Sequence, residues 1–167
     1  MTLRTSCAAL VFLSAMLNVA CSTGKNGEMY QELDFRLFNG ESRDASFTLD
    51  MSDSSCVYEV SLISRLTRKD IQDSVTFAVT ITSPSGLQAG ETVTFPSDYH
   101  ALRSGAADSD DRISTAWSTG HYDVSWLYRD NIEPVEYGEW QLTLSAVDTA
   151  ESMIGAGISI KRIPKVR

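Results

Sequence analysis

The sequence predicts an all-β fold, namely a single antiparallel β-sandwich of the jelly-roll or Ig-like type with about eight or nine strands. Apolar and polar residues alternate along most of the chain, which is the pattern of half-buried strands. Clusters of Ser, Gly, Asn and Pro separate the alternating runs and are typical of turns. No helical pattern of sufficient length lies between the runs, so a parallel α/β fold is disfavoured.

The first alternating run predicts a strand over residues 29–37, followed by a turn at Asn39-Gly40. Four residues share the apolar face of this strand: Met29, Leu33, Phe35 and Leu37. Further strands are expected over residues 45–51, 56–62, 75–81, 91–95, 113–117, 121–128, 140–146 and 158–160. Residues 97–112 show no period, and we expect them to form a long exposed loop.

The N-terminal segment has the pattern of a bacterial export signal. Arg4 precedes an apolar run over residues 7–17, which is too short to span a bilayer. Ala20 directly precedes Cys21, which indicates a lipoprotein signal peptide over residues 1–20 and a diacylglycerol on the thiol of Cys21. The alternative is an ordinary secretory signal that happens to end near a cysteine.

Three segments are expected after the signal: a lipidated polar tether over residues 21–28, a β-sandwich domain over 29–163 and a basic tail over 164–167. Residues 21–167 are enough for one domain with its own core. The lipid on Cys21 would hold the protein at a bacterial membrane, in the cell envelope. The tether lacks a run of acidic residues, which favours the periplasmic side of the outer membrane over the cell surface.

Charge and cysteine content restrict the classes of function. The formal net charge of −8 argues against nucleic acid as a partner, because phosphate binding needs clustered Lys and Arg. Cys7 would leave with the signal and Cys21 would be lipidated, so Cys56 would have no cysteine to pair with. Cys56 begins an alternating run, and we expect it to be a small core residue rather than a catalytic thiol.

The residues needed for catalysis are not evident. The sequence has no Gly-x-Ser-x-Gly, no His-Glu-x-x-His and no Gly-rich phosphate loop. His121 and Asp123 come nearest to an acid–base pair, but residues two apart on a strand merely share a face. We therefore expect no enzymatic activity and no cofactor.

An acidic cluster offers a weak candidate for a metal site. Asp108, Asp110 and Asp111 could supply the carboxylate oxygens that Ca²⁺ prefers. The cluster lacks the glycine and the distal glutamate of a calcium loop, so a solvated acidic loop is the favoured interpretation.

Aromatic residues are dense over residues 117–140. Because aromatic side chains dominate core energetics, we expect Trp126 and Trp140 to pack in the core. Trp117 and Tyr137 are the candidates for surface contact with a partner protein or a sugar ring.

A family resemblance rests on segments in the last third of the chain. They are Asp123–Asp130 (DVSWLYRD), Ile132–Pro134 (IEP), Gly138–Leu144 (GEWQLTL) and Ile154–Lys161 (IGAGISIK). Together they resemble the end of the GldH-like gliding-motility lipoproteins, with the specific part covering residues 117–163. The resemblance implies a β fold, anchoring in the cell envelope and a role in gliding motility, and it carries over no catalytic residues.

Two functions from different classes follow. The leading one is a non-catalytic structural or accessory component of the cell envelope, with an envelope protein as partner. The alternative is a membrane-anchored module that binds a glycan or another ligand. The first predicts a stable protein partner, whereas the second predicts a concave site with exposed rings.

Overall fold

The computed structural model of the chain describes residues 30–38, 43–68, 73–104, 112–147 and 152–165. The expected signal peptide and the tether with Cys21 lie outside these residues. The acidic residues Asp108, Asp110 and Asp111 also lie outside them.

Within the described residues the chain forms nine strands and one short helix, which confirms the all-β prediction. The strands are β1 (Tyr30–Leu37), β2 (Asp44–Met51), β3 (Cys56–Thr67), β4 (Ser74–Thr82), β5 (Gln88–Pro96), β6 (Ile113–Trp117), β7 (His121–Ile132), β8 (Gly138–Ala146) and β9 (Met153–Pro164). The helix is α1 (Tyr99–Arg103). Strand β9 is much longer than expected, because Gly155 and Gly157 weaken the strand pattern in the sequence.

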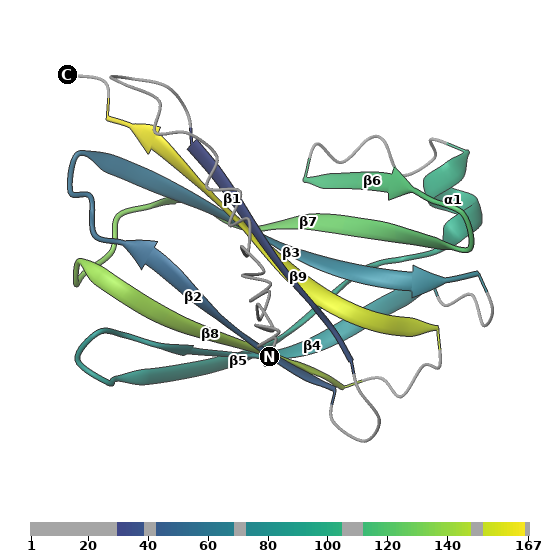
Figure 1. Cartoon of the computed structure of the whole chain (residues 1–167), viewed down its shortest axis with the longest axis horizontal. Helices are drawn as coiled ribbons and strands as arrows, with labels where there is room; N and C mark the ends of the chain where they lie inside the picture. The colour runs from purple at the N-terminus through teal and green to yellow at the C-terminus, as the bar shows by residue number, and fades with distance from the viewer. Residues whose placement is uncertain (1–29, 39–42, 69–72, 105–111, 148–151, 166–167) are drawn as a thin grey trace, which may run out of the picture.

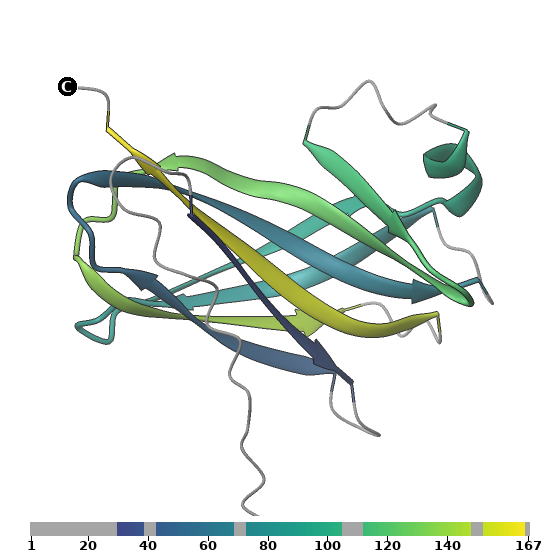
Figure 2. The same ribbon diagram turned by 45° about the horizontal axis from the view of Figure 1, so that its top comes forward.

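The strands pack as two antiparallel sheets, face to face (Figures 1 and 2). One sheet has the order β1-β9-β3-β7-β6 and the other the order β2-β8-β4-β5. The orders 1-9-3-7 and 2-8-4-5 are those of a jelly roll, and β6 is an additional strand beside β7. The first and last strands are therefore neighbours, with Tyr30 opposite Arg162.

The core lies between the two sheets and is built from alternate residues of each strand. In the five-stranded sheet, Leu62 of β3 lies opposite Ile158 of β9 and Trp126 of β7. In the four-stranded sheet, Leu144 lies opposite Val79. Trp126 and Trp140 are half-buried against this core, as the sequence predicts. Cys56 is buried and free, as expected of a small core residue.

Strand β1 contradicts the expectation that its apolar residues face the core. Leu33 and Leu37 are 63% and 64% exposed. The register with β9 places Leu33, Phe35 and Leu37 on the outer face, while Asp34 lies opposite the buried Ile158. Since β1 is at the edge of its sheet, Asp34 still reaches the solvent and forms an ion pair with Arg36.

The ring of Phe35 lies against the outer face of β9. A methyl group on Gly157 would lie 2.6 Å from Cδ2 of Phe35, and one on Gly155 would lie 2.7 Å from Cζ of the same ring. The guanidinium carbon of Arg65 lies 4.3 Å from the ring centre. Arg65 also donates two hydrogen bonds of 2.7 Å to the carboxylate of Asp123. The two glycines thus make room for a ring that an arginine holds in place.

The prediction of a long exposed loop over residues 97–112 is wrong at its start, where α1 forms. The side chain of Asp98 caps this helix by accepting hydrogen bonds from the backbone N–H groups of His100 (2.7 Å) and Ala101 (3.4 Å). Tyr99 and Leu102 are buried. Five residues are too few to show a helical period in the sequence. No helix in the described part of the chain is long and apolar enough to cross a membrane.

The basic residues near the C-terminus take part in the fold. Three of them form ion pairs: Lys161 with Glu59, Arg162 with Asp50 and Lys165 with Glu133. Lys161 and Arg162 lie within β9, and the backbone N–H of Lys165 donates to the carbonyl of Ser55. Residues 166–167 lie outside the described part of the chain.

Candidate functional site

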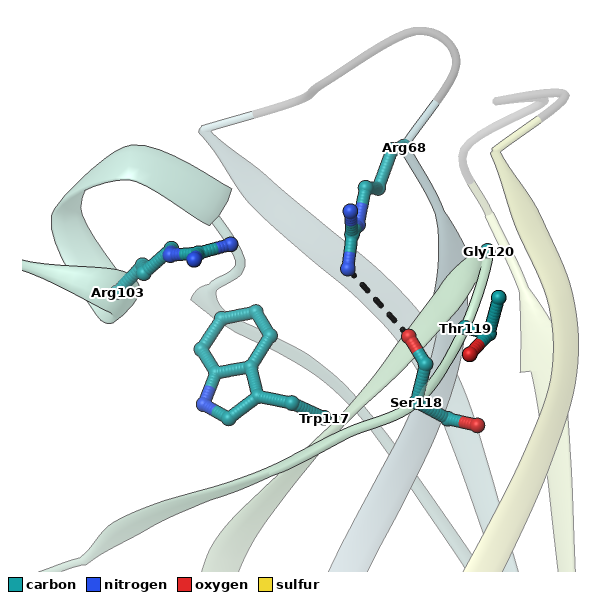
Figure 3. A pocket seen from close by; sticks show the side chains of 6 residues that line it. All are labelled: Arg68, Arg103, Trp117, Ser118, Thr119 and Gly120. Atoms are coloured by element: carbon teal, nitrogen blue, oxygen red, sulfur yellow. Dashed lines mark hydrogen bonds between the residues drawn. The ribbon is translucent and has the colours of Figure 1, made fainter.

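A pocket of about 560 Å³ opens at one end of the sandwich. Three segments line it: Arg68 directly after β3, Arg103 in α1, and Trp117 at the end of β6 with the following turn residues Ser118, Thr119 and Gly120. Figure 3 shows Arg103 reaching over the indole of Trp117 from α1, while Arg68 points toward the carbonyl of Ser118 on the other side of the ring. We call these six residues the Trp117 pocket.

Trp117 is the exposed member of a cluster of three rings. Trp117 stacks on Tyr122 with ring centres 5.3 Å apart and an interplanar angle of 25°. Tyr99 meets Trp117 edge-on at 5.3 Å and Tyr122 at 5.4 Å. Tyr99 and Tyr122 are buried, whereas Trp117 is 42% exposed. The buried rings hold the indole in one orientation.

Tyr122 is tied to the segment before α1. Its hydroxyl donates a 2.9 Å hydrogen bond to the carbonyl of Ser97. Burial disfavours the phenolate and, with the nearby Asp98 and Tyr99, raises the pKa of Tyr122 to about 12. The tyrosine therefore stays neutral at physiological pH and serves as a fixed support for Trp117.

The two arginines converge on Tyr99. Their guanidinium carbons lie 5.2 Å (Arg68) and 5.7 Å (Arg103) from the centre of the Tyr99 ring. Arg68 donates to the carbonyl of Ser118 over 3.4 Å, and Arg103 donates to the hydroxyl of Tyr99. Neither is among the ion pairs that the described residues form with Asp or Glu. The pocket thus gathers positive charge in a chain of net charge −8.

The turn from β6 to β7 forms the rim of the pocket. The backbone N–H of Ser118 donates to the carbonyl of His121 over 3.1 Å. Gly120 has φ +88°, a conformation that residues with a side chain rarely adopt. Ser118 and Thr119 are exposed, and in Figure 3 the hydroxyl of Ser118 points away from the ring of Trp117.

Tyr137, the second predicted contact residue, lies far from this pocket. Trp117 directly precedes the turn into β7, whereas Tyr137 follows the other end of this 12-residue strand. Tyr137 is 46% exposed. An apolar pocket of about 290 Å³ also lies between the sheets at that end, and Trp140 and Leu142 are among its lining residues. The structure therefore does not bring the two candidate contact residues together.

His121 and Asp123 are the residues that come nearest to an acid–base pair, and Asp123 is engaged in an ion pair of the fold. Asp123 is bound through both carboxylate oxygens by Arg65, and this pair lies on the outer face of the sheet. Among the described residues, no group of three or more His, Cys, Asp or Glu side chains could hold a metal ion.

The sequence pattern did not point to Arg68 and Arg103, because both lie in stretches where apolar and polar residues do not alternate regularly. Asp98, at the position of a helix cap before Tyr99, was the available signal for α1 and hence for the place of Arg103. The resulting arrangement can hold an anion beside an exposed aromatic ring. Comparison of the chain with protein-family models, curated proteins and solved structures gives no match.

Proposed function

We propose that this chain is a non-catalytic structural or accessory component of a bacterial cell envelope, anchored by a lipid on Cys21. The family resemblance supports a role of the gliding-motility type, on the periplasmic side of the outer membrane. The observation that carries the proposal is the outward-facing apolar surface of β1 formed by Leu33 and Leu37.

This surface suits an envelope protein as partner. At Phe35 of the edge strand β1, the backbone N–H donates to the carboxylate of Asp34 and the carbonyl accepts from Arg36. A partner that adds as a strand beside β1 would replace these two local contacts with backbone hydrogen bonds. Leu33 and Leu37 would add apolar contacts to those backbone hydrogen bonds. The strand begins nine residues after Cys21, so a fully extended tether holds it within about 30 Å of the lipid. A membrane-associated partner is thus within reach of β1.

The test is crosslinking of the intact lipoprotein in its own membrane, followed by identification of what co-purifies. We expect one stoichiometric envelope protein, which is lost in a Cys21→Ala variant and in a Leu33→Ser/Leu37→Ser double variant. Leu87→Ser is the matched control, because Leu87 is also strongly exposed but lies outside β1. Equal recovery of the partner with the double variant would contradict the role of β1.

A second candidate function is a membrane-anchored module that binds a glycan. The Trp117 pocket favours it, because an exposed indole on a rigid aromatic support is a suitable surface for a sugar ring. We expect immobilised polysaccharide of one class to retain the lipoprotein, and a Trp117→Ala variant to lose retention. Retention that persists in this variant would rule out the pocket as the glycan site.

A further inference from the structure

We propose that the Trp117 pocket selects an acidic saccharide, with the sugar ring on Trp117 and a carboxylate between Arg68 and Arg103. This inference rests on the second candidate function and names the chemical class of its ligand.

The first argument is charge. The guanidinium groups of Arg68 and Arg103 approach the same Tyr99 ring from two elements that are distant in the sequence. Both positive charges lie within 5.7 Å of the centre of one ring, so an anion bound in the pocket would be attracted by both. The planar guanidinium fork matches the geometry of a carboxylate. No ion pair with a described Asp or Glu satisfies either group.

The second argument is that the indole of Trp117 is both exposed and held in a fixed orientation. Large aromatic side chains are usually well buried, yet Trp117 is 42% exposed. Its contacts with Tyr122 and Tyr99 fix the ring before any ligand arrives. A ring that is already ordered binds without the entropic cost of immobilising it.

The third argument is the polar rim, which distinguishes a saccharide from other anions. Two polar residues, Ser118 and Thr119, line the pocket, and the backbone carbonyl of Ser118 faces it; such groups can hydrogen-bond to the hydroxyl groups of a sugar. Arg68 donates a 3.4 Å hydrogen bond to the carbonyl of Ser118, a long contact that a ligand can replace at small cost. A nucleic acid would need more basic groups than this pocket supplies.

The experiment is calorimetric titration of the full-length lipoprotein in detergent micelles. The probes are a galacturonic acid trisaccharide, the methyl ester of the same trisaccharide, and inorganic phosphate. The variants are Arg68→Gln, Arg103→Gln and Trp117→Ala. Arg36→Gln and Tyr137→Ala are the matched controls, because they remove the same kinds of side chain from exposed positions outside the pocket. Thermal unfolding of each variant verifies that it folds.

We expect the acid to bind at least about tenfold more tightly than its methyl ester, and each arginine variant to lose about tenfold in affinity for the acid alone. Trp117→Ala should weaken both saccharides, and the controls should match the wild type. Equal affinity for acid and ester would overturn the charge selection while leaving a glycan-binding function intact. If phosphate binds as tightly as the acidic trisaccharide and displaces it, the assignment of a saccharide as the ligand is overturned. Binding of no probe would overturn both this inference and the glycan-binding function at this pocket.

Discussion

At the scale of single residues, Gly155 and Gly157 show why a small side chain is required inside a strand. Both face the ring of Phe35, and both lie near backbone carbonyl oxygens of β1. A methyl group on Gly157 would lie 2.8 Å from the carbonyl oxygen of Asp34 as well as 2.6 Å from the ring. The backbone of β1 would therefore have to move, since the ring alone cannot relieve both contacts.

We expect Gly157→Ala to lower the free energy of unfolding by about 1–3 kcal/mol, because overpacking forces neighbouring groups apart. Gly90→Ala is the control, since the nearest atom to its new methyl group would be 3.6 Å away. Urea unfolding followed by tryptophan fluorescence measures both. Adding Phe35→Ala to Gly157→Ala should cost less than the sum of the two single changes. Strict additivity would contradict the proposed contact.

Tyr122 makes the free energy of unfolding depend on pH in the alkaline range. Tyrosine ionises near pH 10 in an unfolded chain, whereas the pKa of Tyr122 in the fold is about 12. Below about pH 10 the group is neutral in both states, so its contribution to stability is fully present. As pH rises from 10 toward 12, ionisation stabilises only the unfolded chain, and the free energy of unfolding falls.

We expect Tyr122→Phe to lose less stability than the wild type between about pH 8 and about pH 11, because phenylalanine cannot ionise. Denaturant midpoints at the two pH values measure the difference. Tyr137→Phe removes the hydroxyl of a half-exposed tyrosine and is the control for the substitution itself. An equal loss in Tyr122→Phe and the wild type would show that Tyr122 is not the source.

At the scale of elements, α1 is a short helix on which the pocket depends. It carries Arg103 and places the buried ring of Tyr99 under Trp117. A five-residue helix has little stability of its own, so its cap and its buried residues decide whether it forms. Asp98 is therefore linked to the pocket although it does not line it.

Asp98→Ala should lower the free energy of unfolding by about 1 kcal/mol through loss of the cap. It should also weaken binding of any ligand at the Trp117 pocket, because Arg103 is no longer held in place. Asp98→Asn is the rescue variant, since asparagine caps helices about as well. If Asp98→Asn and Asp98→Ala lose the same stability, then a role other than capping explains the effect.

At the scale of the whole molecule, the jelly roll brings together strands that are far apart in the chain. β1 and β9 pair across nearly the entire described sequence, and β3 pairs with both β7 and β9. Proteins dominated by such non-local pairing fold slowly, because loop closure costs entropy before the contacts form.

We therefore expect refolding on a timescale of milliseconds to seconds, as measured by stopped-flow tryptophan fluorescence after dilution from urea. Refolding complete in the microsecond range would contradict the observed strand order.

The sequence alone determined the all-β class, the approximate positions of the strands, the burial of Cys56 and the packing of Trp126 and Trp140 against the core. It could do so because period-two alternation and turn residues act over short stretches of chain. Lipidation at Cys21 and the partner remain predictions from the same sequence. Only the tertiary structure decided the strand order, the outward face of β1 and the meeting of Arg68, Arg103 and Trp117. Register and strand order depend on which distant residues pair, and no local pattern encodes such a choice.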